Sequence, residues 1–265
     1  FNKDFFQKLR EGYVYRRAGE LNSHSIHLID FSNVESNIFR VVSGLSFSTN
    51  LSAVHNTDLI VYINGIPFIV WAFKDPQEKL QGAETLIKDT LSGCLPELLR
   101  YNAFCVICNG INKTKYGISW GEWRDYREWK RVDEKEQPSN ENILVSTIRG
   151  LFNQERLLKV LESFICFADK NPREKIICRY PQFFASIKLL KSIEEHSKVT
   201  EKGDGKGGIY FGTAGCGKSY TMLFLAKLLQ KSKLLNNPTV VLITDRISLN
   251  RQLHKLFSKH KDYLS

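Results

Sequence analysis

The first half of the chain consists of short runs in which apolar residues alternate with polar ones or cluster, a pattern typical of β-strands. The clearest signal is a pair of apolar runs, Asp58–Ile63 and Ile66–Lys74, on either side of Asn64-Gly65. This dipeptide between β-rich runs predicts a tight hairpin. The other elements predicted in this half are a helix at Phe5–Gly12, strands at Ser25–Asp30, Phe39–Ser43 and Phe104–Cys108, and a helix at Glu78–Leu91.

Helical periodicity takes over in the second half, over Ile143–Phe167 and again over Gln182–His196, with a break around Pro172. A glycine-rich joint then precedes a strand, a loop, a helix and a second strand. Their predicted bounds are Ile209–Gly212 for the first strand, Lys218–Lys231 for the helix and Thr239–Thr244 for the second strand. Such a βαβ unit begins a parallel sheet, so the fold class predicted for the whole chain is α/β.

Size and composition predict a globular protein with two domains. The chain has 265 residues, of which 42% are hydrophobic, and a net charge of +10. This excess suits a polyanionic partner, with nucleic acid as the leading candidate, although solvated surface lysines explain it equally well. No apolar run approaches the roughly 18 to 20 residues that span a bilayer, and no apolar leader opens the sequence. We therefore expect a cytoplasmic protein without a membrane partner.

The six cysteines are spread without the rhythm of a disulfide framework, which favours reduced thiols. Cys105 and Cys108 have the spacing of a zinc ligand pair, but they lie in the apolar strand Phe104–Cys108. Residues three apart on a strand face opposite sides of the sheet. We expect this pair to pack in the core rather than to bind a metal.

The strongest chemical signal is an octapeptide that fits G-x-x-x-x-G-K-[ST], the pattern of a phosphate-binding loop. Its residues are Gly212, Thr213, Ala214, Gly215, Cys216, Gly217, Lys218 and Ser219. The glycines let the backbone curl so that several N–H groups point at phosphate oxygens, and the following helix adds its dipole. Lys218 would neutralise the β and γ phosphates of ATP, and the Ser219 hydroxyl would ligate Mg²⁺.

Two weaker signals lie on either side of this loop. Gln182, in Arg179-Tyr180-Pro181-Gln182, carries an amide that could read the adenine edge, although a solvated glutamine at a helix start is the ordinary alternative. Thr244 and Arg246 follow an apolar run, where ligands bind in open α/β sheets. They could touch a nucleic-acid backbone, although a plain helix cap is nearly as good an explanation.

The hairpin carries part of a second catalytic pattern, D…[DE]-x-K, in which carboxylates bind Mg²⁺ and a lysine stabilises charge on the attacked phosphate. Asp58 and Lys74 occupy the outer positions, and the middle acid is replaced by Ala72. A simple two-residue turn would pair residue 58 with 71 and leave Asp58 facing away from Lys74. We predict instead a three-residue connection centred on Gly65 with a bulge, which pairs 58 with 72 and puts 58, 72 and 74 on one face.

Several stretches together resemble the restriction (R) subunit of type I restriction-modification enzymes. The stretches that carry the resemblance are Leu28-Ile29-Asp30-Phe31 with Asn37, Asp58–Pro67, Phe73–Pro76, Tyr101-Asn102, Asn109-Gly110, Tyr116-Gly117, Trp129-Lys130, Glu155–Leu158, Arg179–Gln182, the phosphate loop and Thr244-Asp245-Arg246. They follow one another in order over nearly the whole chain.

The resemblance implies a PD-(D/E)xK endonuclease-like domain over residues 1–150, with a mixed sheet and helices. It implies a helical linker with Gln182 over 151–200 and the first part of a RecA-like P-loop ATPase, a parallel-sheet domain, over 201–265. Asp58 would bind the nuclease Mg²⁺ and Lys74 would be the catalytic lysine, while Gln182 and the loop would bind ATP with Mg²⁺. The implied partners are double-stranded DNA and the modification (methyltransferase) and specificity subunits. The implied activity is ATP-driven translocation with Mg²⁺-dependent cleavage.

Ala72 departs from the family, which has Glu at this position, so we expect impaired cleavage. The intact Asp58 and Lys74 favour an engineered change, whereas the missing Gln-x-x-x-Tyr on the following helix favours natural decay. Two alternatives are a DNA translocase or remodeller whose first domain only binds DNA, and a scaffold that docks a partner. The aromatic and basic run Trp120–Arg131 fits DNA contact, docking or packing. Because the chain ends about 46 residues past Ser219, we expect phosphate affinity without ATP hydrolysis.

Overall fold

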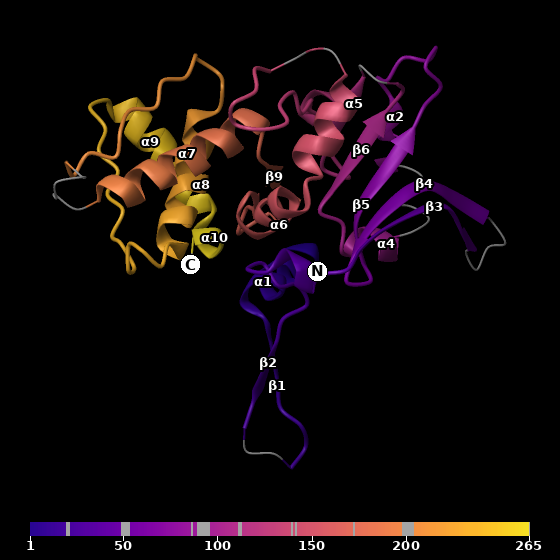
Figure 1. Cartoon of the computed structure of the whole chain (residues 1–265), viewed down its shortest axis with the longest axis horizontal. Helices are drawn as coiled ribbons and strands as arrows, with labels where there is room; N and C mark the ends of the chain where they lie inside the picture. The colour runs from indigo at the N-terminus through magenta and orange to yellow at the C-terminus, as the bar shows by residue number, and fades with distance from the viewer. Residues whose placement is uncertain are drawn as a thin grey trace. The chain divides into compact units, whose positions relative to one another are not determined.

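The computed structural model in Figure 1 describes residues 1–264 except 20–21, 49–53, 86, 89–95, 111–112, 139, 141, 172 and 198–203. The chain divides into two compact units, Phe1–Glu162 and Ser163–Ser265, each with its own internal packing. Among the described helices, none combines the length and the apolar character that a membrane crossing requires. The predicted division at residues 150 and 200 stays a prediction.

A five-stranded mixed sheet organises the first unit. Its strands are, in order across the sheet, β3 (Phe39–Ser48), β4 (Val54–Ile63), β5 (Ile66–Phe73), β6 (Phe104–Cys108) and β7 (Thr114–Gly117). β5 and β6 run parallel, and the other neighbours are antiparallel. The mixed sheet and the strand at Phe104–Cys108 confirm the predictions, whereas β3 is longer than the predicted Phe39–Ser43. All five residues of β6 are buried, as its continuous apolar run requires.

The β4–β5 hairpin closes with a two-residue turn. Asn64 (φ 51°) and Gly65 (φ 82°) both have positive φ, as a type I′ turn requires, and Ile63 pairs with Ile66 across it. The predicted three-residue connection is therefore wrong. The bulge lies further along: Tyr62 pairs with Pro67 but Val61 pairs with Ile69, so Phe68 is the extra residue. Its side chain is fully buried and packs on Phe5 and Phe6 of α1 (Asn2–Glu11).

The tip of this hairpin is fixed to the loop before β3 by the Asn64 side chain. Its amide nitrogen donates to the carbonyl of Leu28 (2.8 Å) and to Asn37 Oδ1 (3.0 Å), and its oxygen accepts from the Ile38 N–H (2.7 Å). Asn37 is buried and in turn bonds the backbone of Asp30 in both directions. These residues, which carried part of the family resemblance, therefore hold the turn in place.

The N-terminal elements of the first unit include a thin ribbon. β1 (Tyr13–Tyr15) and β2 (His24–Ile26) pair as an isolated antiparallel pair directly after α1, drawn in indigo in Figure 1. The predicted strand Ser25–Asp30 is thus wrong at its end, because Asp30 lies in a turn. β2 already ends at Ile26, and the Asp30 carboxylate accepts from the Ser32 and Asn33 backbone N–H groups, which shapes the turn that follows. A 3₁₀ turn, η1 (Val34–Ser36), follows.

The helices of the first unit that follow the sheet strands are short. They are α2 (Ala83–Thr85), α4 (Pro96–Arg100), the 3₁₀ turn η3 (Trp123–Asp125), α5 (Ile143–Ser146), the π-helical turn η4 (Thr147–Leu151) and α6 (Gln154–Ser163). Residues 86 and 89–91 of the predicted helix Glu78–Leu91 lie outside the described residues. The predicted helix Ile143–Phe167 is interrupted at η4 and ends at Ser163. Its last residues instead form strand β8.

The second unit combines one small hairpin with helices. β8 (Ile165–Phe167) pairs with β9 (Lys175–Ile177), and α7 (Tyr180–His196), α8 (Lys218–Lys231), α9 (Ile247–Lys259) and α10 (Lys261–Leu264) follow. The Phe164 ring packs between Phe183 of α7 and Phe224 of α8, with centroid distances of 4.7 and 5.3 Å. α7 and α8 confirm the helices predicted at Gln182–His196 and Lys218–Lys231.

The two strands predicted around the phosphate loop do not form in the described chain. Residues 209–212 and 239–244 belong to no sheet. Ile209 is 96% exposed and Ile243 90% exposed. A parallel strand exists only when neighbouring strands accept and donate its backbone hydrogen bonds, and no described segment pairs with either run. The apolar sequence of these two runs was therefore not sufficient to make them strands.

Candidate functional site

The hairpin register brings the two retained residues of the nuclease pattern to one face. Leu59 pairs with Trp71, so the next position places Asp58 opposite Ala72. Lys74 follows directly after β5, and its N–H donates to the Cys108 carbonyl at 2.8 Å, so the strand alternation continues and puts Lys74 on the same side of the sheet as Ala72. The register therefore puts residue 58 across from residue 72, as predicted, although the Phe68 bulge rather than a longer turn produces this register. Asp58 and Lys74 do not lie on opposite faces.

The charged groups at this end of the hairpin have partners within the protein. Asp58 Oδ2 accepts a hydrogen bond from the backbone N–H of Phe73 at 2.7 Å. The Lys74 ammonium lies 3.4 Å from a carboxylate oxygen of Glu78, four residues further on. The sequence pattern did not single out Glu78 as a partner of Lys74, because residues 74–78 form a turn rather than a helix. Both retained residues are thus held by local contacts.

Ala72 lies in an apolar environment. It is 4% exposed and belongs to a buried cluster with Ile60, Val70, Leu80 and Ala83. A methyl group offers no ligand atom, and no described group of three or more His, Cys, Asp or Glu residues is arranged to hold a metal ion. The donor set around Asp58 therefore does not fit a catalytic Mg²⁺.

The phosphate loop has the backbone that its glycines predict. Gly215 (φ 76°) and Gly217 (φ 87°) take conformations that L side chains rarely adopt, and Gly217 is the N-cap of α8. The next two residues, Lys218 and Ser219, are the first of the helix, so their N–H groups have no intrahelical acceptor. The Lys218 ammonium folds back onto the carbonyls of Gly212 (2.7 Å) and Thr213 (2.9 Å). A strong cation and orphan N–H groups therefore meet at one helix start, which suits an anion.

Gln182 joins the loop to the start of α7. Its Oε1 accepts from the Arg179 N–H at 2.8 Å, and its Nε2 donates to the Gly217 carbonyl at 3.1 Å. A Cβ at Gly217 would lie 2.4 Å from Nε2, so only glycine leaves room for this contact. A primary amide has two donor hydrogens and two acceptor lone pairs. One of each remains after these bonds, which is the number that an adenine edge needs.

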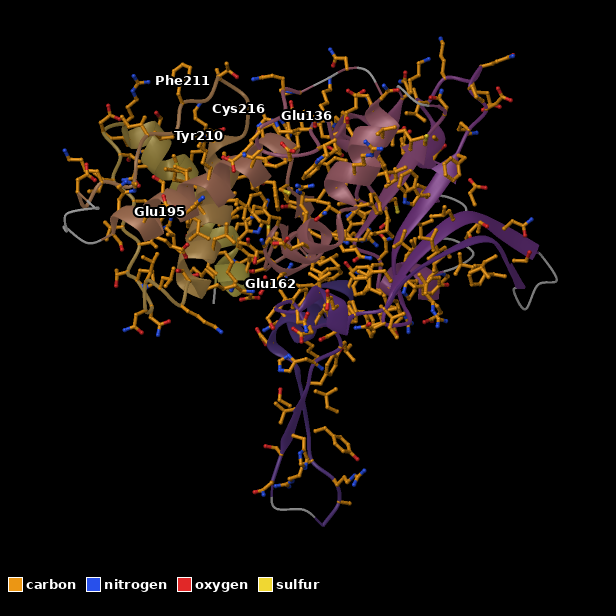
Figure 2. All side chains as sticks on the ribbon, viewed as in Figure 1. Glu136, Glu162, Glu195, Tyr210, Phe211 and Cys216 are labelled. Atoms are coloured by element: carbon orange, nitrogen blue, oxygen red, sulfur yellow. The ribbon has the colours of Figure 1, made fainter. Side chains whose placement is uncertain are left out.

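Tyr210 and Cys216 are residues at the loop whose mutual contact the sequence pattern did not reveal. A Cβ at Gly212 would meet Cys216 Sγ at 2.8 Å and the Tyr210 hydroxyl at 3.2 Å, so Gly212 lets the two side chains approach. Burial raises the pKa of the Tyr210 phenol, and the neighbouring Cys216 thiol adds to the shift. Figure 2 labels Tyr210, Phe211 and Cys216 at the same edge of this unit.

Thr244 and Arg246 lie at the start of α9. Arg246 is its N-cap, is exposed, and has extended backbone (φ −114°, ψ 126°), while Thr244 is half-buried. The Arg246 side chain makes no capping hydrogen bond. The alternative that these residues merely cap the helix therefore has no side-chain hydrogen bond to support it. Contact with nucleic acid stays a prediction.

Two other features have a packing role. Tyr126 and Trp129, from the aromatic run Trp120–Arg131, are buried, and Trp129 Nε1 donates to the Arg131 carbonyl at 2.6 Å. Burial raises the pKa of the Tyr126 phenol far above its ordinary value. Cys105 and Cys108 are free and buried, as expected for core residues. Cys94 lies outside the described residues.

A cavity of about 590 Å³ lies elsewhere in the first unit, lined by His27, Ile29, Asp30, Phe31, Ser32 and Glu162, the last labelled in Figure 2. Its acid Asp30 accepts three hydrogen bonds, from the Ser32 hydroxyl and the Ser32 and Asn33 N–H groups. These bonds lower the pKa of the Asp30 carboxyl. Asp30 therefore shapes a turn.

Two family models match the chain. Residues 1–122 match the type I restriction enzyme R protein N terminus, and residues 181–264 match the SWI2/SNF2 ATPase family. The first match contains Asp58, Ala72 and Lys74. The second contains Gln182, the phosphate loop and Arg246.

Curated relatives align along almost the whole chain. A putative type I restriction enzyme MjaIXP endonuclease subunit from Methanocaldococcus jannaschii is 32% identical over 97% of this chain and 26% of its own length. The type I restriction enzyme HindI endonuclease subunit from Haemophilus influenzae is 30% identical over 99% of this chain and 26% of its own length. The chain thus spans about a quarter of these relatives.

Proposed function

The chain belongs to the restriction (R) subunits of type I restriction enzymes, with the N-terminal nuclease-family region and the start of the helicase-type motor region, and from this premise we propose that it binds ATP with Mg²⁺ and duplex DNA. The ATP would drive translocation along DNA, and the nuclease domain would cut it in a subunit with an intact site. The proposed partners are the modification (methyltransferase) and specificity subunits, and the proposed location is the cytoplasm.

The contact between Gln182 and Gly217 carries the nucleotide part of this proposal. It supports a site in which the remaining N–H and the remaining lone pair of the Gln182 amide bind the adenine edge. Lys218 and the first N–H groups of α8 would hold the phosphates. The Ser219 hydroxyl would ligate Mg²⁺. When bound, ATP supplies a phosphoanhydride whose hydrolysis releases the energy for movement. The chain's own residues bind and orient it.

For the nuclease activity, the proposal differs between this chain and a subunit with an intact site. Because the donor set around Asp58 lacks a second carboxylate, we propose that the chain itself cuts DNA poorly or not at all. The bonds of Asp58 to Phe73 and of Lys74 to Glu78 favour one alternative function, a translocase or remodeller whose first domain binds DNA without cutting. A scaffold that docks a partner would bind DNA with no response to Mg²⁺.

The nucleotide site is tested by titrating the chain with a fluorescent ATP analogue in the presence of Mg²⁺. Lys218→Ala removes charged hydrogen bonds to phosphate, which are worth about 1.5–3 kcal/mol, so we expect about a tenfold to hundredfold weaker affinity. Lys231→Ala is the matched control, because it removes the same charge from the last residue of the same helix. Equal affinity of the two variants would exclude the proposed site.

A further inference from the structure

The positive charge of the chain is concentrated in its last part. Residues 205–265 contain ten lysines and arginines and only two acids, Asp245 and Asp262, so they carry +8 of the net +10. The preceding 204 residues have 28 lysines and arginines against 26 acids and are nearly balanced. A generally basic protein would spread this excess over its length. In this chain one region holds it.

Helix α9 and its flanks hold half of these cations. From Arg246 to Lys261 the chain has five lysines and arginines, two histidines and no acid. α9 packs on the protein through Leu253, which is the buried residue of the fully described helix Ile247–Lys259. Arg251, His254 and Lys255 lie three and four residues apart, so they share a face, and all three are exposed. We call these three residues the α9 basic face.

The cations of this face are not neutralised within the described part of the chain. Lys259, at the end of the helix, forms an ion pair with Glu174, whereas no described acid forms an ion pair with Arg246, Arg251 or Lys255. The first turn of α9 has no acid either, although a carboxylate there would be favoured by the helix dipole. An arginine stands at the N-cap instead. An external anion would relieve both the repulsion between cations and the unfavourable end of the dipole.

We propose that the α9 basic face binds the phosphate backbone of duplex DNA, without reading the base sequence. Guanidinium and ammonium groups in a row match the closely spaced charges of a duplex. The fully exposed residues of α9 are polar or charged apart from Ile247 at its first position. That arrangement favours a nucleic acid over a lipid surface, which would need exposed apolar residues between the cations. The inference rests on the proposed function and assigns a surface to its DNA.

The test measures how the affinity of the 265-residue chain for DNA depends on salt. A fluorescein-labelled duplex of about 24 base pairs and arbitrary sequence is titrated with protein at several NaCl concentrations, and anisotropy gives the affinity. The variant is the double substitution Arg251→Gln with Lys255→Gln. Each lost phosphate contact lowers the slope of log affinity against log salt by about 0.9, so we expect a fall of about 1.8.

The matched control removes two exposed cations elsewhere, Arg124→Gln with Lys191→Gln. These side chains are 80% and 75% exposed, and each already lies beside an acid, Glu122 or Glu195. We expect the control to keep the wild-type slope. A slope of the α9 variant equal to that of the control would overturn the inference and leave the proposed function standing.

Two further measurements separate the possible failures. Fluorescent ATP-analogue binding should be unchanged in the α9 variant, because neither substituted residue belongs to the loop, and a parallel loss would mean that the unit has unfolded and that the face has a structural role only. If the wild-type chain fails to bind the duplex at the lowest salt, the DNA part of the proposed function fails, and the inference fails with it.

Discussion

At the residue scale, the end of the β4–β5 hairpin shows how one methyl group changes a site. Asp58 and Lys74 keep the positions that the nuclease pattern requires, but their polar atoms bond Phe73 and Glu78. Between them Ala72 continues the apolar cluster of Ile60 and Val70. A carboxylate at position 72 would share a face with Asp58 and Lys74. The methyl group at position 72 thus offers no metal ligand, and the pairing of the two strands is unaffected.

We expect Ala72→Glu, placed in a complete subunit, to gain Mg²⁺-dependent nicking of plasmid DNA, because two carboxylates on one face can hold the ion. The control is Ala83→Glu, which puts a carboxylate into the same buried cluster from α2 rather than from β5. Without Mg²⁺ both variants should lose about 1–3 kcal/mol in urea unfolding, because each buries an unpaired acid. Absence of nicking by Ala72→Glu would indicate a decayed site or a wrong assignment.

At the element scale, the runs on either side of the phosphate loop have strand-like sequence but no strand partners among the described residues. Residues 240–243 are all exposed, and Phe211 is 89% exposed. The loop and α8 nevertheless have the local geometry of a phosphate site, because the glycines and the helix start are set by nearby residues. Among the described residues, the loop and helix of the predicted βαβ unit therefore form without the two strands predicted beside them.

Amide hydrogen exchange tests this difference between elements. We expect residues 240–243 to exchange close to the rate of an unstructured peptide, because no described group accepts their N–H bonds. Residues 69–72 of β5 should be protected, because they pair with β4 on one side and β6 on the other. Slow exchange in 240–243 would show that these residues pair in solution, which would contradict the exposed arrangement.

The same contrast shows which elements the sequence could predict. Asn64-Gly65 marks a hairpin locally, and the period of the apolar residues in α7 and α8 is set by the helix itself, so these elements were predicted correctly. The register of the hairpin was predicted correctly, but the bulge at Phe68 produces it and not a longer turn. The side chain of Phe68 packs against Phe5 of α1, a contact that the local sequence does not reveal. β8 was predicted as helix, because a run of three apolar residues has no period of its own. Its partner β9 decides its structure.

The candidate site was predictable to a similar degree. The loop residues were predicted from their spacing and Gln182 from its position upstream of the loop. The structure brings Gln182 to Gly217, and the binding of ATP by these residues stays a prediction. Glu78 and the contact of Tyr210 with Cys216 were missed, because they arise from side chains that meet only after folding. A sequence pattern thus predicts a glycine-rich loop well, because the loop is local in the chain. It predicts contacts between side chains poorly.

At the scale of the whole molecule, the two units differ in charge as well as in architecture. The sheet unit is close to neutral, and the unit with the phosphate loop carries most of the positive charge. That unit is also nearly free of acids after Gly205, where only Asp245 and Asp262 occur. Phosphoryl transfer from ATP needs an acid to hold the metal and a residue to orient the attacking water.

We therefore expect the 265-residue chain to bind a fluorescent ATP analogue without releasing phosphate from ATP, with or without duplex DNA. The readouts are fluorescence titration and a phosphate-release assay on the same preparation. Lys218→Ala should weaken the first signal and leave the second at background. Phosphate release above that background by the wild-type chain would contradict this expectation.

The bulge at Phe68 has a consequence for how this chain tolerates changes in length. Side chains on a strand alternate between faces, so the face of a residue depends on whether an odd or even number of residues separates it from the turn. Phe68 is the one unpaired residue that sets this parity between Gly65 and Ala72. Deleting or inserting a single residue there would turn positions 72 and 74 away from Asp58. In variants of this hairpin, insertions or deletions that keep positions 58, 72 and 74 on one face must therefore involve an even number of residues.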